Sequence, residues 1–211
     1  MMSFWFIILL CGYTGLVFPQ YTNCVSKSPD TLSAGSVLFE FNPRTEKFQD
    51  LLEFSGSYYP ELIGVKIEVR RKKITTMMAA RPRRDFLFCS KDKRTYVLLI
   101  TEKFSMNADS IYNQLGPCAI IGVLGHELSH IADYSTKTNA ELLFFGIKYV
   151  INRREIEKQT DLAAIEHGFG PGLVEFTRFI HHSPLVDKKY RNKKSKYYLS
   201  AVDLESSLTD L

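Results

Sequence analysis

The feature that most constrains the fold of this chain is the run H-E-L-S-H at positions 126–130, at the end of an almost wholly apolar segment. Residues four apart share one face of a helix, so His126 and His130 can reach one metal ion, and Glu127 can hold a water molecule beside it. Pro117 suits the first turn of this helix, where its missing N–H costs nothing. Burying these polar groups is costly without a partner, which a metal ion would provide.

A catalytic zinc site usually has three protein ligands and one open position. Residues 131–136 lack the further Gly and His that would supply a ligand soon after His130, so we expect a downstream carboxylate instead. Residues 152–165 predict a second helix, on which Glu157 and Asp161 lie four apart on one face. Glu157 is the expected ligand, and Asp161 can accept a hydrogen bond from the far nitrogen of a ligand imidazole.

Two other carboxylates remain open as the third ligand. Glu141 lies nearer to His130 in the sequence, and Glu155 lies two positions from Glu157 and points elsewhere on a helix. Charged residues at helical spacing, such as Glu157 and Asp161, also commonly form a solvated face. The pair of histidines upstream favours Glu157 as the ligand.

The motif H-E-x-x-H at 126–130 followed by E-x-x-x-D at 157–161 resembles the signature of the gluzincin zinc metallopeptidases, in particular the Ste24/HtpX-type (M48) family. The resemblance covers residues 115–170 and is closest to small members that are soluble or anchored once in a membrane. The chain departs from the family pattern at Thr160, where family members usually have a small residue.

The resemblance implies a zinc-dependent endopeptidase acting on a peptide or protein substrate. An alternative is a catalytically silent zinc-binding or surface-binding module that keeps the fold, although such a module does not need the base Glu127. The residue roles that the resemblance implies are His126, His130 and Glu157 as ligands of one Zn²⁺, Glu127 as general base and then proton donor, and Asp161 as support for a ligand imidazole.

A peptidase of this kind also needs a donor for the oxyanion. The downstream candidates are not separated by the sequence, and His167, before Gly168, is also suited to a helix end. These candidates are His167, His181, His182, Tyr190 and Arg191.

The N-terminal segment from Phe4 to Phe18 is nearly all apolar and suits the core of a signal peptide better than a spanning helix. No Lys or Arg precedes it, and no clear A-x-A cleavage site follows. We therefore expect residues 1–20 to be a signal peptide or an anchor, and residues 21–211 to form one zincin-like domain. This predicts a protein that is exported, as a periplasmic or secreted protein, or held at a membrane by its N-terminus.

The net charge of +4 indicates no particular partner. Of the four cysteines, Cys11 would leave with a signal peptide. The remaining three, Cys24, Cys89 and Cys118, allow at most one bridge. Cys118 lies on the apolar helix, where we interpret it as a buried thiol.

The first half of the chain predicts strands at 62–69, 73–79, 85–89 and 95–101, after a short helix at 48–54. A strand-rich half followed by helices predicts an α+β domain, with helices packed on one face of an antiparallel sheet. In gluzincins a sheet edge above the zinc helix pairs with the substrate, and an exposed edge can add a peptide strand. The sequence does not identify that edge.

Residues 142–151 are apolar but too short to span a membrane, and Lys148 interrupts them. We predict a buried core helix here, with a segment that dips into a membrane as the alternative.

The basic segment 187–198 carries interleaved tyrosines, which leaves an acidic membrane surface or a nucleic acid as possible partners. We interpret it as a solvated loop and expect no nucleic-acid partner. Ser200 and Asp203 then predict a capping box for a last short helix.

Overall fold

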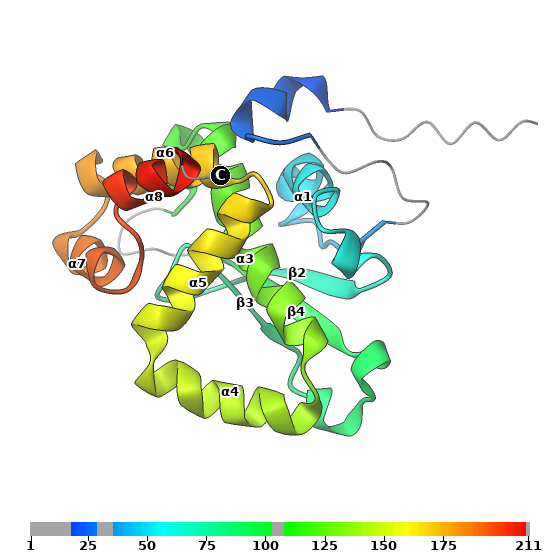
Figure 1. The fold of residues 1–211 in the computed structure, drawn as a ribbon. Helices are drawn as coiled ribbons and strands as arrows, with labels where there is room; N and C mark the ends of the chain where they lie inside the picture. Colours follow the sequence, from blue (N-terminus) through cyan, green and yellow to red (C-terminus); the bar gives the residue numbers. More distant parts are fainter. Residues whose placement is uncertain (1–17, 29–35, 103–107, 210–211) are drawn as a thin grey trace, which may run out of the picture.

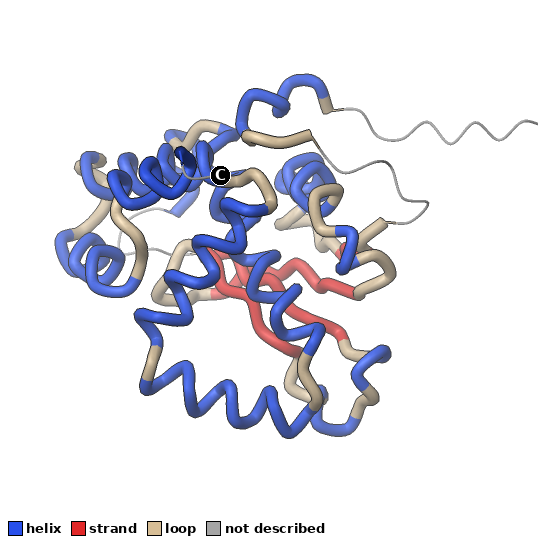
Figure 2. Tube along the Cα trace, in the orientation of Figure 1, coloured by secondary structure: helices blue, strands red, loops and turns tan. Residues whose placement is uncertain are grey.

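A computed structural model describes residues 18–28, 36–102 and 108–209 (Figure 1). The expected signal peptide or anchor falls almost wholly on residues 1–17, which lie outside the described residues. The described part is an α+β structure, in which four short strands are followed by a series of helices (Figure 2).

The sheet has the strand order β1-β2-β4-β3 and is mixed rather than antiparallel. β1 (Leu38–Glu40) and β4 (Thr95–Thr101) both run parallel to β2 (Lys66–Lys72), and only β3 (Met78–Pro82) is antiparallel to its neighbour, β4. The prediction of an antiparallel sheet was therefore wrong.

The connections explain the mixed sheet. Helix α1 (Gln49–Gly56) lies in the crossover between β1 and β2, and parallel neighbours require such a crossover. After β2 the chain does not fold back on it, because β4 takes the position beside β2 and leaves β3 at the outer edge. Residues 73–79, expected as a partner for the strand at 62–69, thus contribute to a strand that pairs elsewhere.

β4 has the predicted bounds and is buried along its whole length. The predicted strand at 85–89 is instead a 3-10 turn, η4 (Phe86–Phe88). The backbone N–H of Phe86 bonds to the carbonyl of Arg83, and that of Phe88 to the carbonyl of Asp85. These local bonds use the donors that a strand would offer to a neighbour.

Helix α3, which carries the H-E-x-x-H motif, lies at the centre of the helical part and packs against β3, α1, α5 and α6 (Figure 1). It starts at Pro117, as predicted. The helices after β4 are α2 (Ala108–Gln114), α3 (Pro117–Thr136), α4 (Asn139–Ile151), α5 (Arg153–Glu166), α6 (Gly170–His182), α7 (Lys188–Tyr197) and α8 (Ala201–Thr209).

Two glycines let α3 and α6 approach closely. A Cβ on Gly122 would lie 2.2 Å from the carbonyl carbon of Gly172, and a Cβ on Gly172 would lie 2.4 Å from the carbonyl oxygen of Cys118. Because both obstacles are backbone atoms, neither helix could relieve the contact by moving a side chain.

A disulfide joins Cys24, at the end of the 3-10 turn η1 (Pro19–Cys24), to Cys118 in the first turn of α3. The interpretation of Cys118 as a buried thiol was therefore wrong, while Cys89 is a free thiol. The disulfide ties the start of the described chain to the helix that carries the motif.

Two surface predictions were also wrong. α4 is a helix as predicted, but only Leu142 on it is buried, so it is not a core helix. The basic segment forms α7 rather than a loop, because the side chain of Asp187 caps its first turn and Tyr190 is buried. The predicted capping box of Ser200 and Asp203 at the start of α8 is confirmed.

Within the described ranges, no helix combines the length and the apolar character needed to cross a membrane.

Candidate metal centre

The middle of α3 presents His126 and His130 on one face, one turn apart. Their rings meet edge to face with centroids 4.9 Å apart, and both side chains are buried. The helix is anchored nearby, because the hydroxyl of Tyr59 donates to the carbonyl of Gly125 at 2.5 Å and contacts Ser129 Oγ at 2.8 Å. The packing of α3 and its bonds to Tyr59 thus hold the two imidazoles in the interior of the protein.

α5 brings Glu157 to the same place. Its Oε2 lies 3.3 Å from Nε2 of His126 and 3.3 Å from Nε2 of His130, and the side chain is 1% exposed. One ligand atom from each residue lies within 4.8 Å of the others, so the three form a buried cluster that could hold a metal ion. Of the three carboxylates considered, the structure therefore brings Glu157 to the histidines.

The far nitrogens of both imidazoles also have partners. Nδ1 of His126 lies 2.8 Å from Oδ1 of Asp161, as expected, and Asp161 Oδ2 accepts the backbone N–H of Leu199 at 3.1 Å. Nδ1 of His130 lies 3.3 Å from the hydroxyl of Thr160. The residue at which the chain departs from the family pattern thus contacts the second imidazole, which sequence reasoning missed.

Glu157 presents its two oxygens to different partners. While Oε2 faces the histidines, Oε1 accepts hydrogen bonds from the hydroxyls of Tyr149 and Tyr198, the latter at 3.0 Å, and from the guanidinium of Arg153 at 3.2 Å. These donors orient the carboxylate. Arg153 could have been found from its spacing of four residues to Glu157, but nothing in the sequence points to Tyr198.

The electrostatics of the cluster favour a bound cation. Burial acts against a charge on His126, but the hydrogen bonds to Asp161 and Glu157 outweigh it and raise the pKa of His126 to about 10. Burial likewise acts to raise the pKa of Glu157, but contacts with both histidines hold it well below its usual range. Without a metal, a proton on the imidazole therefore balances the buried carboxylates.

Glu127 does not belong to the cluster of three ligand candidates but lies beside it. It lies next to β3, where Ala80 gives it a backbone hydrogen bond, and burial raises the pKa of its carboxyl. Glu127, His130 and Glu157 line a cavity of about 730 Å³, whose other walls include β3, residues 74–76 before it, α4, and Lys193 and Tyr198 near the C-terminal end. The cluster is thus reached from a cavity with a carboxyl group beside it.

The rival ligands lie elsewhere. Glu141 closes the capping box of α4 with Thr138, and Glu155 accepts a hydrogen bond from Gln159 on the surface of α5.

Of the oxyanion-donor candidates, His167 pairs with Glu61 at 2.9 Å, while Arg191 donates to the backbone carbonyls of His181 and Val186. Tyr190 is buried close to the cluster, in the lining of a small cavity with His126 and Glu127. The structure gives His182 no place in the site.

No family model matches the chain, and neither the curated proteins nor the solved structures contain a match.

Proposed function

We propose that this chain is a zinc-dependent endopeptidase. The observation that carries the proposal is the buried set of His126, His130 and Glu157 beside a separate carboxyl, Glu127, on the wall of a cavity that a substrate can enter. A purely structural zinc site is closed by four protein ligands, whereas three ligands leave one position open.

Zinc fits the donor set better than a hard cation does. Two imidazole nitrogens and one carboxylate oxygen are typical zinc ligands, while Mg²⁺ and Ca²⁺ prefer oxygen ligands alone. The partners of the far imidazole nitrogens, Asp161 and Thr160, are the kind of support that zinc ligands receive. Bound here, zinc would supply Lewis acidity, polarising a peptide carbonyl and making a water molecule more acidic.

Glu127 performs the proton transfers in this proposal. Its carboxylate accepts a proton from the attacking water as the water oxygen bonds to the carbonyl carbon, and returns it to the amide nitrogen as the C–N bond breaks. The raised pKa of Glu127 suits this role, because a base that must later act as an acid works best near the ambient pH.

β3 is the strand along which we place the substrate. Met77 and Arg83, which flank β3, form backbone hydrogen bonds with Thr101 and Thr95 of β4. In the alternating antiparallel pattern Met78 and Ala80 therefore direct their backbone groups to the other side. That side lines the cavity beside Glu127. An extended peptide adding to this edge would pass in front of the cluster.

The resemblance to the Ste24/HtpX-type peptidases agrees with this arrangement. On the same basis we propose that the sheet and helices pack as in the zincins. We also propose that the protein is exported or anchored at a membrane by its N-terminus. The disulfide between Cys24 and Cys118 supports an oxidising compartment, because structural disulfides are rare where thiols are kept reduced.

The test is the zinc content of the purified full chain beside Glu157→Ala. We expect one zinc per wild-type chain and a loss of zinc in the variant. Glu155→Ala, on the exposed side of the same helix, is the matched control and should keep its zinc. A folded wild-type chain that binds no zinc would overturn the proposal.

Hydrolysis is tested separately with a library of unstructured peptides. Glu127→Gln should retain zinc but lose cleavage, because the amide cannot accept the proton. Wild-type chain that holds zinc yet cleaves no peptide would instead identify a silent zinc-binding module.

A further inference from the structure

The exposed apolar side chains of this protein are concentrated on one helix. Phe144, Val150 and Ile151 of α4 are 71%, 81% and 75% exposed. α4 lies at one edge of the molecule, away from α6 and α8 (Figure 1). Five of the ten exposed large hydrophobic residues in the described part of the chain belong to it, namely Leu143, Phe144, Ile147, Val150 and Ile151.

Both sides of α4 are apolar, the side that packs on the protein and the side that faces outward. Leu142 is buried and Phe145 and Tyr149 are half-buried towards the body of the protein, so the exposed residues form the opposite, outward stripe. A stable water-exposed helix normally places polar residues there. With 13 residues, α4 is also well short of the roughly 20 that a helix needs to cross a bilayer.

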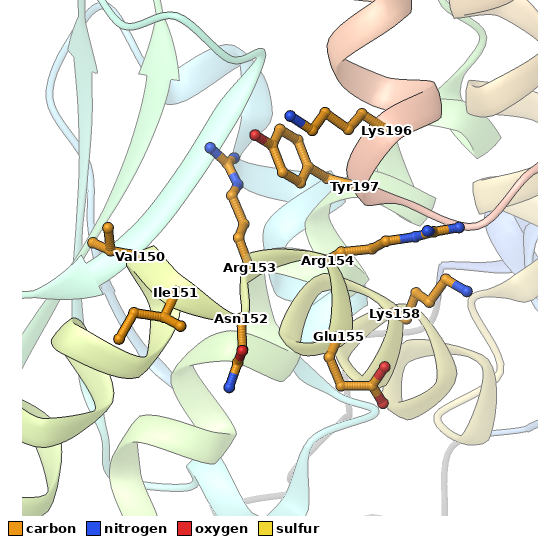
Figure 3. A pocket seen from close by; sticks show the side chains of 9 residues that line it. All are labelled: Val150, Ile151, Asn152, Arg153, Arg154, Glu155, Lys158, Lys196 and Tyr197. Atoms are coloured by element: carbon orange, nitrogen blue, oxygen red, sulfur yellow. The ribbon is translucent and has the colours of Figure 1, made fainter.

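A basic pocket adjoins the end of this stripe. The turn from α4 to α5, with Lys196 and Tyr197 of α7, surrounds a cavity of about 610 Å³ (Figure 3). Val150 and Ile151 form its apolar lip, and the basic side chains that line it are Arg153, Arg154, Lys158 and Lys196.

The positive charge of this pocket is only partly balanced. Arg153 is paired with Glu157, and Glu155 lines the pocket with the other three basic side chains. Asp203 of α8 also interacts electrostatically with Lys158 and Arg154, so the four cations exceed the nearby carboxylates by one. Lys148 adds a further exposed cation on α4 itself.

We propose that α4 and this basic pocket form a docking surface for an anionic lipid bilayer. The stripe of Phe144, Ile147 and Val150 would enter the boundary between headgroups and acyl chains, with the helix lying in the plane of the membrane. Arg154, Lys158 and Lys196 would bind the phosphate and carboxylate groups of anionic headgroups.

Charge complementarity favours a bilayer over a second copy of this chain. Two copies joined through the stripe would bring their basic pockets into the same interface, where like charges oppose association. An anionic bilayer meets both features together, since it offers an apolar layer beside a negatively charged one. The inference does not depend on the proposed peptidase activity.

The test places a fluorescent reporter on α4 of the full chain. The only tryptophan, Trp5, lies in the apolar N-terminal segment, which could itself bind vesicles. The variant Trp5→Phe/Phe144→Trp therefore reports on α4 alone. With vesicles of phosphatidylcholine and phosphatidylserine, we expect its emission to shift to shorter wavelength and to be quenched by brominated lipid.

Two controls make this readout specific. Trp5→Phe/Val202→Trp places the reporter at an exposed position of α8 and should show neither effect. Adding Arg154→Glu and Lys158→Glu to the α4 reporter should weaken vesicle binding at least about tenfold, because the substitutions remove attraction to the anionic headgroups and add repulsion.

Three results would overturn the proposal. One is an unchanged spectrum of the α4 reporter with anionic vesicles, and another is an equal response to vesicles of phosphatidylcholine alone. The third is a spectral shift that grows with protein concentration in the absence of lipid, which would assign the stripe to contact between copies.

Discussion

Tyr198 donates a hydrogen bond to Oε1 of Glu157, which lies 41 residues earlier in the chain, at 3.0 Å. The next residue, Leu199, donates its backbone N–H to Asp161. The short link between α7 and α8 therefore orients the two carboxylates that α5 directs towards the histidines. The candidate metal cluster thus depends on a segment far from the H-E-x-x-H motif in the sequence.

Replacing Tyr198 by Phe should weaken metal binding without unfolding the protein. The ring remains, but Glu157 loses one of the donors that orient it, and loss of such a partner typically lowers metal affinity about 10–100-fold. Competition with a chelator measures the change. Tyr197→Phe is the matched control, since its ring can still stack on Arg153, and an equal loss there would contradict the role given to Tyr198.

Gly122→Ala should destabilise the fold strongly. The added methyl group would meet backbone atoms of Gly172 and Leu173, and we expect the free energy of unfolding to fall by about 3 kcal/mol, the upper part of the usual range for overpacking.

Gly146→Ala on α4 is the control for helix propensity. A Cβ there meets nothing within 4 Å, so it should raise the free energy of unfolding by about 0.5–1 kcal/mol. Urea unfolding of both variants measures the two changes in free energy. Similar changes at the two positions would rule out the close contact of α3 and α6.

The disulfide should contribute measurably to stability. Cys24 and Cys118 are 94 residues apart, and closing a loop of this size in the unfolded chain typically stabilises a protein by about 2–4 kcal/mol. Cys24→Ser/Cys118→Ser should lower the free energy of unfolding by that amount and remove its dependence on reductant. Cys89→Ser should behave as wild type, because Cys89 is a free thiol.

The pair of His167 and Glu61 predicts a pH dependence of stability. Burial opposes the charge on His167, but the hydrogen bond to Glu61 outweighs it and raises the pKa of His167 above 6.5. Burial likewise acts to raise the pKa of Glu61, but the bond with His167 lowers it below 4.5. The contribution of the histidine to stability is complete below pH 6.5 and is lost as the pH rises through its folded pKa. The contribution of the glutamate is complete above pH 4.5 and is lost as the pH falls through its folded pKa.

Both groups therefore contribute between these two values. The difference in free energy of unfolding between wild type and His167→Gln should shrink from about pH 6 to about pH 9. Because both side chains are partly exposed, the change should be about 1 kcal/mol or less. A difference that stays constant or grows over this range would contradict the ion pair.

The sequence predicted what depends on local periodicity. The spacing of His126 and His130 required one helix face, and that of Glu157 and Asp161 a second, so these spacings alone were enough to propose the cluster. β4 was also predictable, because its continuous apolar run suits a strand buried on both faces.

The predictions that were wrong concern contacts between residues that are far apart in the sequence. The position of β3 beside β4 rather than β2, the outward stripe of α4, and the hydrogen bond from Tyr198 all result from competition among long-range contacts. A local pattern fixes the type of an element but not the surface that it packs against. The apolar residues 142–151 therefore predicted a helix correctly and its burial wrongly.

The link that orients the two carboxylates also sets the order in which the site can be completed during synthesis. Both histidines and Glu157 leave the ribosome well before Tyr198, the later partner of that carboxylate. A nascent chain therefore contains the three side chains of the cluster before it contains the hydroxyl of Tyr198 and the backbone N–H of Leu199 that orient its carboxylates. The geometry of the cluster is thus complete only after the link between α7 and α8 has been synthesised and has folded back onto α5.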